Sequence, residues 1–167
     1  ERVASHALML YEHTKGILHQ DKGEGKELLW AAAMLHACGQ HINLSAYHKH
    51  SWYLIKNGEL LGYSQVEHLM VASIARYHRR TLPKKRHESW QCFINGSQRR
   101  IVFEMSLLLR LAVSLDRRPN PVVKLIEVTS NTKELIIELI PEIKDQNINL
   151  EKWSLMNNFA LIKEVNN

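Results

Sequence analysis

One apolar segment constrains the fold of this chain more than any other, IVFEMSLLLRLAVSL at residues 101–115. With its flanks it predicts a helix over Gln98–Asp116 that is apolar on nearly all sides. Such a helix is stable only when other elements cover it, so we expect it at the centre of a helical bundle. The segment is too short, and with Glu104 and Arg110 too charged, to span a bilayer.

Further helices are predicted by helical periodicity and by end signals. Ser64 and Glu67 have the spacing of a capping box, so a helix should begin there and run to about His78. Pro83 should end this part of the chain's helical structure. The remaining predicted helices cover Val3–His19, Lys26–Cys38, Tyr47–Asn57, Lys84–Ile94 and Leu150–Val165.

The character of the sequence changes at RRPNP, where Pro119 and Pro121 should stop helix formation. Beyond them, the pattern predicts two β-strands around a turn at Ser130–Asn131, followed by the last helix. We therefore expect a mainly α protein, with a helical domain over residues 1–118 and a small α+β domain over residues 119–167.

The first residue is Glu1, and a helical pattern is already in progress there, so we expect the chain to be a piece of a longer protein. Two cysteines, Cys38 and Cys92, are too few for a disulfide framework. They indicate a reducing compartment, which predicts the cytoplasm.

Positive charge is concentrated in one segment, RYHRRTLPKKRH at residues 76–87, which has six Lys or Arg and no Asp or Glu. Taking these six from the 22 basic residues of the chain leaves 16 against 17 acidic ones, so the net charge of +5 is a local feature. A concentrated basic segment favours an anionic partner.

Histidines are concentrated in residues 32–55, where His36, His41, His48 and His50 raise the question of a metal site. The stretch has no carboxylate, and His48 and His50 are two residues apart, which points them in different directions on a helix. At a helix start they could instead assist anion binding, since backbone N–H groups there favour negative charge. Equally, one imidazole could cap the helix while the other is solvated.

Four stretches carry a family resemblance: LLWAAAMLHACGQHI, YHKHSWYLI, ARYHRRTLPKKRH and LLLRLAVSLDR. In this order and spacing the chain resembles the C-terminal half of the exopolyphosphatase / guanosine-pentaphosphate phosphohydrolase (Ppx/GppA) family. The resemblance implies an HD-domain-like helical bundle and a small domain after it. It also implies a homodimer, and a parent enzyme that uses Mg²⁺ and carries its catalytic acids in N-terminal actin-like domains, which this chain does not contain.

The HD pattern that the resemblance implies is incomplete in this sequence. His36 stands at the histidine of the His–Asp pair, Ala37 stands where the aspartate belongs, and Asp116 matches the distal aspartate. A methyl group cannot ligate a divalent ion, so we predict that this chain holds no metal and no catalytic residue, and that His36 and Asp116 are vestigial. We expect His36 to pack in the bundle and Asp116 to pair with Arg117, Arg118 or another basic neighbour.

The basic segment supplies the predicted phosphate site because guanidinium groups hold phosphate oxygens with two hydrogen bonds and lysines act as point charges. We predict a non-catalytic module that binds inorganic polyphosphate or guanosine pentaphosphate. A divergent HD phosphohydrolase acting on nucleotides and a nucleic-acid or regulatory binding module are the alternatives. His87 belongs to the segment, and Arg99, Arg100, Arg117 and Arg118 could extend it. The predicted phosphate ligands are Arg76, His78, Arg79, Arg80, Lys84, Lys85, Arg86, His48 and His50.

Overall fold

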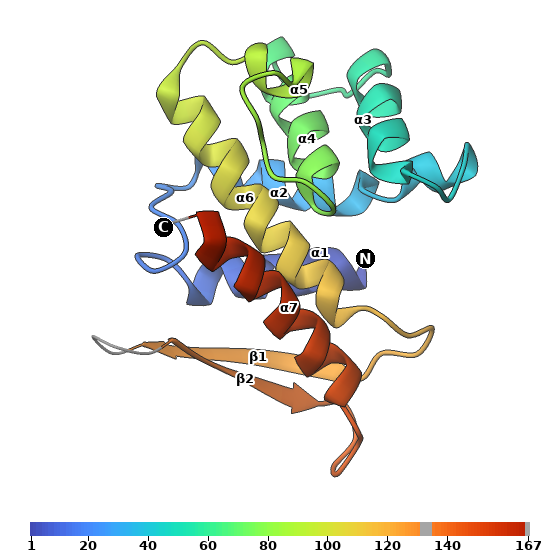
Figure 1. Ribbon diagram of the computed structural model, residues 1–167, viewed down its shortest axis with the longest axis vertical. Coiled ribbons are helices and arrows are strands. Elements are labelled where there is room, and N and C mark those ends of the chain that lie inside the picture. The colour runs from blue at the N-terminus through green and yellow to red at the C-terminus, as the bar shows by residue number, and fades with distance from the viewer. Residues whose placement is uncertain (131–134, 166–167) are drawn as a thin grey trace.

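The computed structural model describes the backbone of residues 1–130 and 135–165, and the protein is mainly α, as the sequence predicted. Figure 1 shows a bundle of helices above a two-stranded sheet, with the last helix lying across both. In chain order the elements are α1 Arg2–His13, α2 Glu24–Leu35, the 3₁₀ helix η1 Cys38–His41, α3 Tyr47–Asn57, α4 Gln65–Tyr77, α5 Glu88–Gln91, α6 Gly96–Leu115, β1 Val123–Ser130, β2 Leu135–Pro141 and α7 Asn149–Val165.

Helix α6 lies at the centre of the bundle, which confirms the prediction from its apolar sequence. It contacts α1, α2, α4 and α7, and it runs diagonally through the molecule in Figure 1. Val102, Leu108 and Leu109 on this helix are fully buried. Its two central charged residues are buried as well, because Glu104 is 9% exposed and Arg110 only 2%. The Arg110 guanidinium is therefore an interior group that needs polar partners.

Side-chain caps fix where several helices begin. The predicted capping box of α4 is present, since Ser64 Oγ accepts from the Glu67 N–H and the Glu67 carboxylate accepts from the Ser64 N–H. Asp21, which is 2% exposed, accepts a hydrogen bond from the Tyr11 hydroxyl at 2.6 Å and from the Gly25 N–H at 2.9 Å, and so orders the approach to α2. These bonds satisfy N–H groups that a helix start leaves without partners.

Two predicted helices are shorter than expected. The first ends at His13 instead of His19, where the Thr14 hydroxyl donates to the Leu10 carbonyl at 2.7 Å and the chain turns. The helix predicted over Lys84–Ile94 is mostly wrong, because only Glu88–Gln91 is helical. The sequence patterns could not reveal that residues before Glu88 form a loop tied to α6.

The strands β1 and β2 pair antiparallel, with Ile126 opposite Leu139. The predicted turn falls partly outside the described residues, which stop at Ser130 and resume at Leu135. Ile126 is fully buried and shares one apolar core with the helices. The boundary predicted after residue 118 stays a prediction, but β1 contacts α1 and α7 contacts α6. In the described part of the chain no helix is both long and apolar enough to cross a membrane.

Candidate functional site: a basic cleft between α4, α6 and α7

The basic segment turns sharply where α4 ends, and Arg110 holds that turn. Its guanidinium donates to the carbonyl oxygens of Tyr77 at 2.9 Å, Arg80 at 3.3 Å and Thr81 at 3.4 Å. Arg80 has a φ of 64°, the left-handed conformation that is uncommon for a residue with a side chain. Three hydrogen bonds from one buried group thus fix the end of α4 and the unusual backbone after it. They also fix the part of the backbone from which the Arg79 and Arg80 side chains extend.

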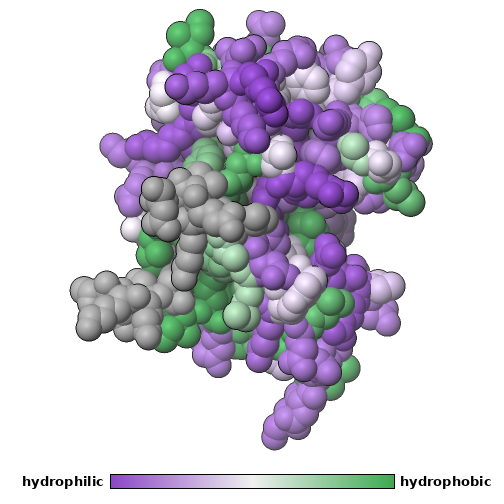
Figure 2. All heavy atoms as spheres, in the orientation of Figure 1, coloured by the Kyte–Doolittle hydropathy of each residue, from purple (hydrophilic) through white to green (hydrophobic). Residues whose placement is uncertain are grey.

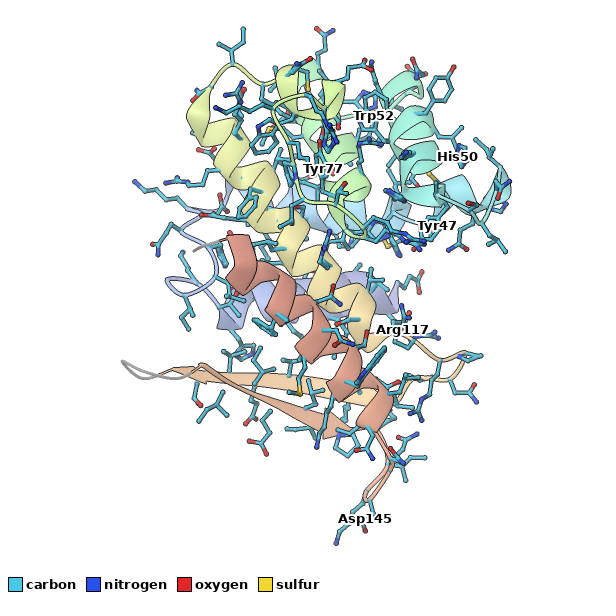
Figure 3. All side chains as sticks on the ribbon, viewed as in Figure 1. Tyr47, His50, Trp52, Tyr77, Arg117 and Asp145 are labelled. Carbon is cyan, nitrogen blue, oxygen red and sulfur yellow. The ribbon has the colours of Figure 1, made fainter. Side chains whose placement is uncertain are left out.

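A cleft of about 530 Å³ opens beside this turn. Four of the residues that line it are arginines, and none of the lining residues is acidic. Figure 3 shows Tyr47 at the end of α3 and Arg117 farther along the same face, near α7. The face is strongly hydrophilic at the level where α4 meets α6 (Figure 2). The lining residues are Tyr47, His78, Arg79, Arg80, Arg110, Val113, Ser114, Arg117 and Asn158.

His78 lies beneath the cleft, not on its surface, with an exposure of 1%. Its Nδ1–H donates to the Ala75 carbonyl at 2.5 Å, and its Nε2 accepts from the Tyr47 hydroxyl at 3.0 Å. Burial lowers the pKa of His78 to about 3, so the imidazole is neutral at pH 7. With both nitrogens in use, His78 positions Tyr47, and Arg79 lies over the Tyr47 ring at 4.5 Å.

The structure brings neither His48 nor His50 to the cleft. His48 is 5% exposed, and burial together with the charges of Arg79 and Arg76 lowers its pKa to about 4. It is therefore uncharged at pH 7, so it offers no positive charge to attract a phosphate. His50 is half-buried on α3, outside the cleft lining. Helix α3 begins after Ala46, which has a φ of 53° and offers no side-chain cap.

The rest of the basic segment lies outside the cleft, around Tyr77 and His87. Arg76 lies over the rings of Trp52, at 5.6 Å, and Tyr77, at 5.9 Å. The exposed residues 84–86 and the half-buried His87 follow in the loop before α5, and none of them lines the cleft. His87 Nδ1 accepts the Lys84 N–H at 3.3 Å. Of the seven predicted ligands in the segment, only Arg79, Arg80 and the buried His78 border the cleft.

Sequence reasoning missed several residues of the cleft. Arg110 was seen only as a charge within an apolar helix, although a single arginine in such a helix is a signal that a buried polar contact must exist. Tyr47, Ser114 and Asn158 have no sequence signal that separates them from other polar residues. Arg117 was predicted to extend the basic surface, and it lines the cleft. Arg118 is instead paired with the buried Glu151, with 3.1 Å between its Nε and the carboxylate.

The remaining HD positions do not fit a metal ion. His36 Nδ1–H donates to the Ala33 carbonyl at 2.6 Å, and burial lowers the pKa of His36. Asp116 accepts from Arg2 Nε at 2.8 Å, so it pairs with a basic neighbour, as predicted, and that neighbour is Arg2 and not Arg117 or Arg118. Ala37 between them supplies no ligand. Among the side chains that the structure describes, three or more ligating groups do not gather at any point.

The class of protein to which this fold and cleft belong is a phosphatase domain. The family model described as Ppx/GppA phosphatase, domain III, matches residues 1–158, and the chain belongs to this family. The resemblance seen in the sequence is thereby confirmed.

Three individual relatives of this chain carry the same name. Over 121 residues the chain is 36% identical to guanosine-5'-triphosphate,3'-diphosphate pyrophosphatase of Vibrio parahaemolyticus. The matched residues are 72% of this chain and 23% of the relative. The enzyme of that name from Pseudoalteromonas translucida is 38% identical over 94 residues, which are 56% of this chain and 18% of the relative. In Pseudoalteromonas atlantica it is 29% identical over 161 residues, 92% of this chain and 31% of the relative. The chain thus spans less than a third of the length of these relatives.

Proposed function

We propose that this chain is a non-catalytic phosphate-binding module of a Ppx/GppA phosphohydrolase. It binds inorganic polyphosphate or guanosine pentaphosphate in the basic cleft, while N-terminal actin-like domains and their Mg²⁺ carry out hydrolysis. The observation that carries the proposal is the convergence of Arg79, Arg80, Arg110 and Arg117 on one cleft whose lining has no carboxylate. The name of the relatives, guanosine-5'-triphosphate,3'-diphosphate pyrophosphatase, supports the second of these ligands.

The arginines suit this ligand because of how they are held. Arg79 lies over Tyr47, and the backbone of Arg80 is fixed by Arg110. A side chain that is already ordered loses less conformational freedom on binding, so more of its interaction energy appears as affinity. Guanidinium groups also match the oxygen spacing of phosphate.

The two alternative functions have less support. A metal-dependent HD reaction needs Asp116 free and a carboxylate at position 37, whereas Asp116 is bound to Arg2 and residue 37 is alanine. Single-stranded nucleic acid usually stacks its bases on aromatic rings, and Arg79 already covers the ring of Tyr47, the one aromatic residue of the cleft lining apart from His78.

Salt-dependent binding tests the proposal. Binding of a defined polyphosphate to the 167-residue chain should weaken steeply with ionic strength, because bound phosphates release counterions. A triple variant with Arg79→Gln, Arg80→Gln and Arg117→Gln should bind less tightly and show a shallower salt dependence. The matched control loses the same charge at three exposed residues outside the cleft, with Lys124→Gln, Lys144→Gln and Lys152→Gln. Equal losses in both variants would contradict the proposal.

The proposal includes a homodimer in the cytoplasm. The support for the dimer is apolar surface on the C-terminal part of the chain, where Trp153 is 61% exposed, Met156 71% and Ile136 52%. Apolar surface of this kind is often covered by a partner. Light scattering after size-exclusion chromatography should give a dimer mass, and Trp153→Ser with Met156→Ser should shift it towards the monomer. A monomer at all concentrations of the unchanged chain would contradict this part.

A further inference from the structure

Arg110 is a buried cation whose hydrogen bonds go to uncharged groups. Its guanidinium has three backbone carbonyl partners, and no acidic side chain within the described residues forms an ion pair with it. Its Nε has no hydrogen-bond partner at all. Burial lowers the pKa of Arg110 to about 10 with no offsetting anion, and the group remains charged at pH 7.

Such an arrangement is unfavourable in the free protein. Carbonyl dipoles satisfy hydrogen bonds but do not neutralise the charge, and buried charges in proteins are normally paired. Arg110 is also one of the residues that line the cleft. The position where a compensating anion could approach is therefore the cleft itself.

We propose that the part of the basic cleft next to Arg110 is a subsite for one phosphoryl group, which supplies the counter-charge that the protein lacks. The proposal rests on the proposed function, and it names the position within the cleft where one phosphate is held most tightly. Arg79 and Arg80 border the same cleft and would hold the outer oxygens, or the next phosphate along a chain.

The other side chains of the cleft agree with this subsite. Ser114 lies one helical turn after Arg110 on α6, and its hydroxyl proton is used on the Leu111 carbonyl at 2.6 Å. The Tyr47 hydroxyl donates to His78. Both hydroxyl protons are already engaged, so positive charge, not hydroxyl donation, would dominate the hold on the ligand. A compact, highly charged anion is favoured by such a site.

Arginine side-chain NMR on the unchanged chain tests the subsite directly. During titration with pyrophosphate, the Nε–Hε resonances of Arg110, Arg79 and Arg80 should shift together, with one dissociation constant. A shift of Arg79 and Arg80 without Arg110 would overturn the subsite and leave the proposed function intact. If none of the three shifts, phosphate does not bind in the cleft and the proposed function fails with it.

A substitution at Ser114 gives a second test with a matched control. Ser114→Asp places a carboxylate beside Arg110, and Ser114→Asn adds nearly the same volume without charge. With the internal counter-charge, pyrophosphate should bind about tenfold more weakly, or worse, to the Asp variant than to the Asn variant. The Asp variant should also melt at a higher temperature than the Asn variant in the absence of ligand. Equal affinities would overturn the subsite.

Discussion

The hydroxyl of Tyr47 donates a hydrogen bond to Nε2 of His78 over 3.0 Å, and so joins the first residue of α3 to the residue that follows α4. His78 is neutral, and its other nitrogen donates to Ala75, so its tautomer is fixed. The guanidinium of Arg79 lies over the Tyr47 ring. The position of a cleft arginine thus depends on a hydrogen bond between two buried, uncharged groups.

Tyr47→Phe should destabilise the protein by about 1–3 kcal/mol, because it leaves the buried Nε2 of His78 without a donor. Urea unfolding monitored by circular dichroism measures this. Tyr53→Phe is the control, since Tyr53 is 60% exposed on the same helix and its loss of a hydroxyl should have almost no effect. Similar unfolding midpoints for the two variants would show that the bond to His78 contributes little.

Stability should fall as the pH is lowered from 6.5 towards 4.5. The folded-state pKa values of His78 and His48 are about 3 and about 4, whereas in the unfolded chain both are near the ordinary value of 6.5. In this window the unfolded chain binds protons that the folded chain does not, so unfolding becomes easier by at most about 1.4 kcal/mol per pH unit for each histidine. Urea midpoints at several pH values measure the slope, and His48→Gln should make it shallower. A slope that is flat between pH 6.5 and 4.5 is incompatible with buried neutral histidines.

Glu151→Gln should weaken the attachment of α7. The Glu151 side chain is fully buried and pairs with Arg118, whose side chain is 33% exposed. Because solvent reaches the arginine, we expect a cost of about 1–2 kcal/mol, below that of a fully buried pair. Urea unfolding measures it, and limited proteolysis should show earlier cleavage in the C-terminal part. Glu142→Gln, at an exposed position just after β2, is the control and should leave both readouts unchanged.

Gly39→Ala should be among the most damaging small substitutions in the helical part. A Cβ at this position would lie 2.3 Å from both the Ser51 nitrogen and the Tyr47 oxygen, which are backbone atoms of α3. Helix α3 would have to move away from η1, at a cost of about 1–3 kcal/mol or more. The control is Gly96→Ala, where a Cβ meets nothing within 4 Å. Thermal melting compares the two variants, and equal melting temperatures would mean that α3 moves freely.

Local signals in the sequence were sufficient for much of the fold. The apolar run around Leu108 and the capping box at Ser64 act within one helix, and the α3 bounds Tyr47–Asn57 were predicted correctly. The site depended on contacts between distant residues. Arg110 reaches back to the Tyr77 carbonyl, which is 33 residues away in the chain, and no spacing rule reveals such a bond.

The same limit explains why the sequence did not reveal that His78 is buried. A histidine within a basic segment is typical of an anion site, but the burial of His78 follows from how α3 and α4 meet, which periodicity does not describe. The turn after α4 is another case, because the buried guanidinium of Arg110 binds the carbonyls of Arg80 and Thr81, which lie 30 and 29 residues away in the chain, and no local pattern describes such a contact.

Asn158 gives the cleft a wall from the last helix of the chain, although the arginines precede it by 41 residues or more. During synthesis on the ribosome, Arg79 and Arg80 emerge long before α7 does. The complete cleft therefore forms only after α7 has been synthesised, and a nascent chain that lacks α7 displays cationic side chains without the concave shape that selects among anions.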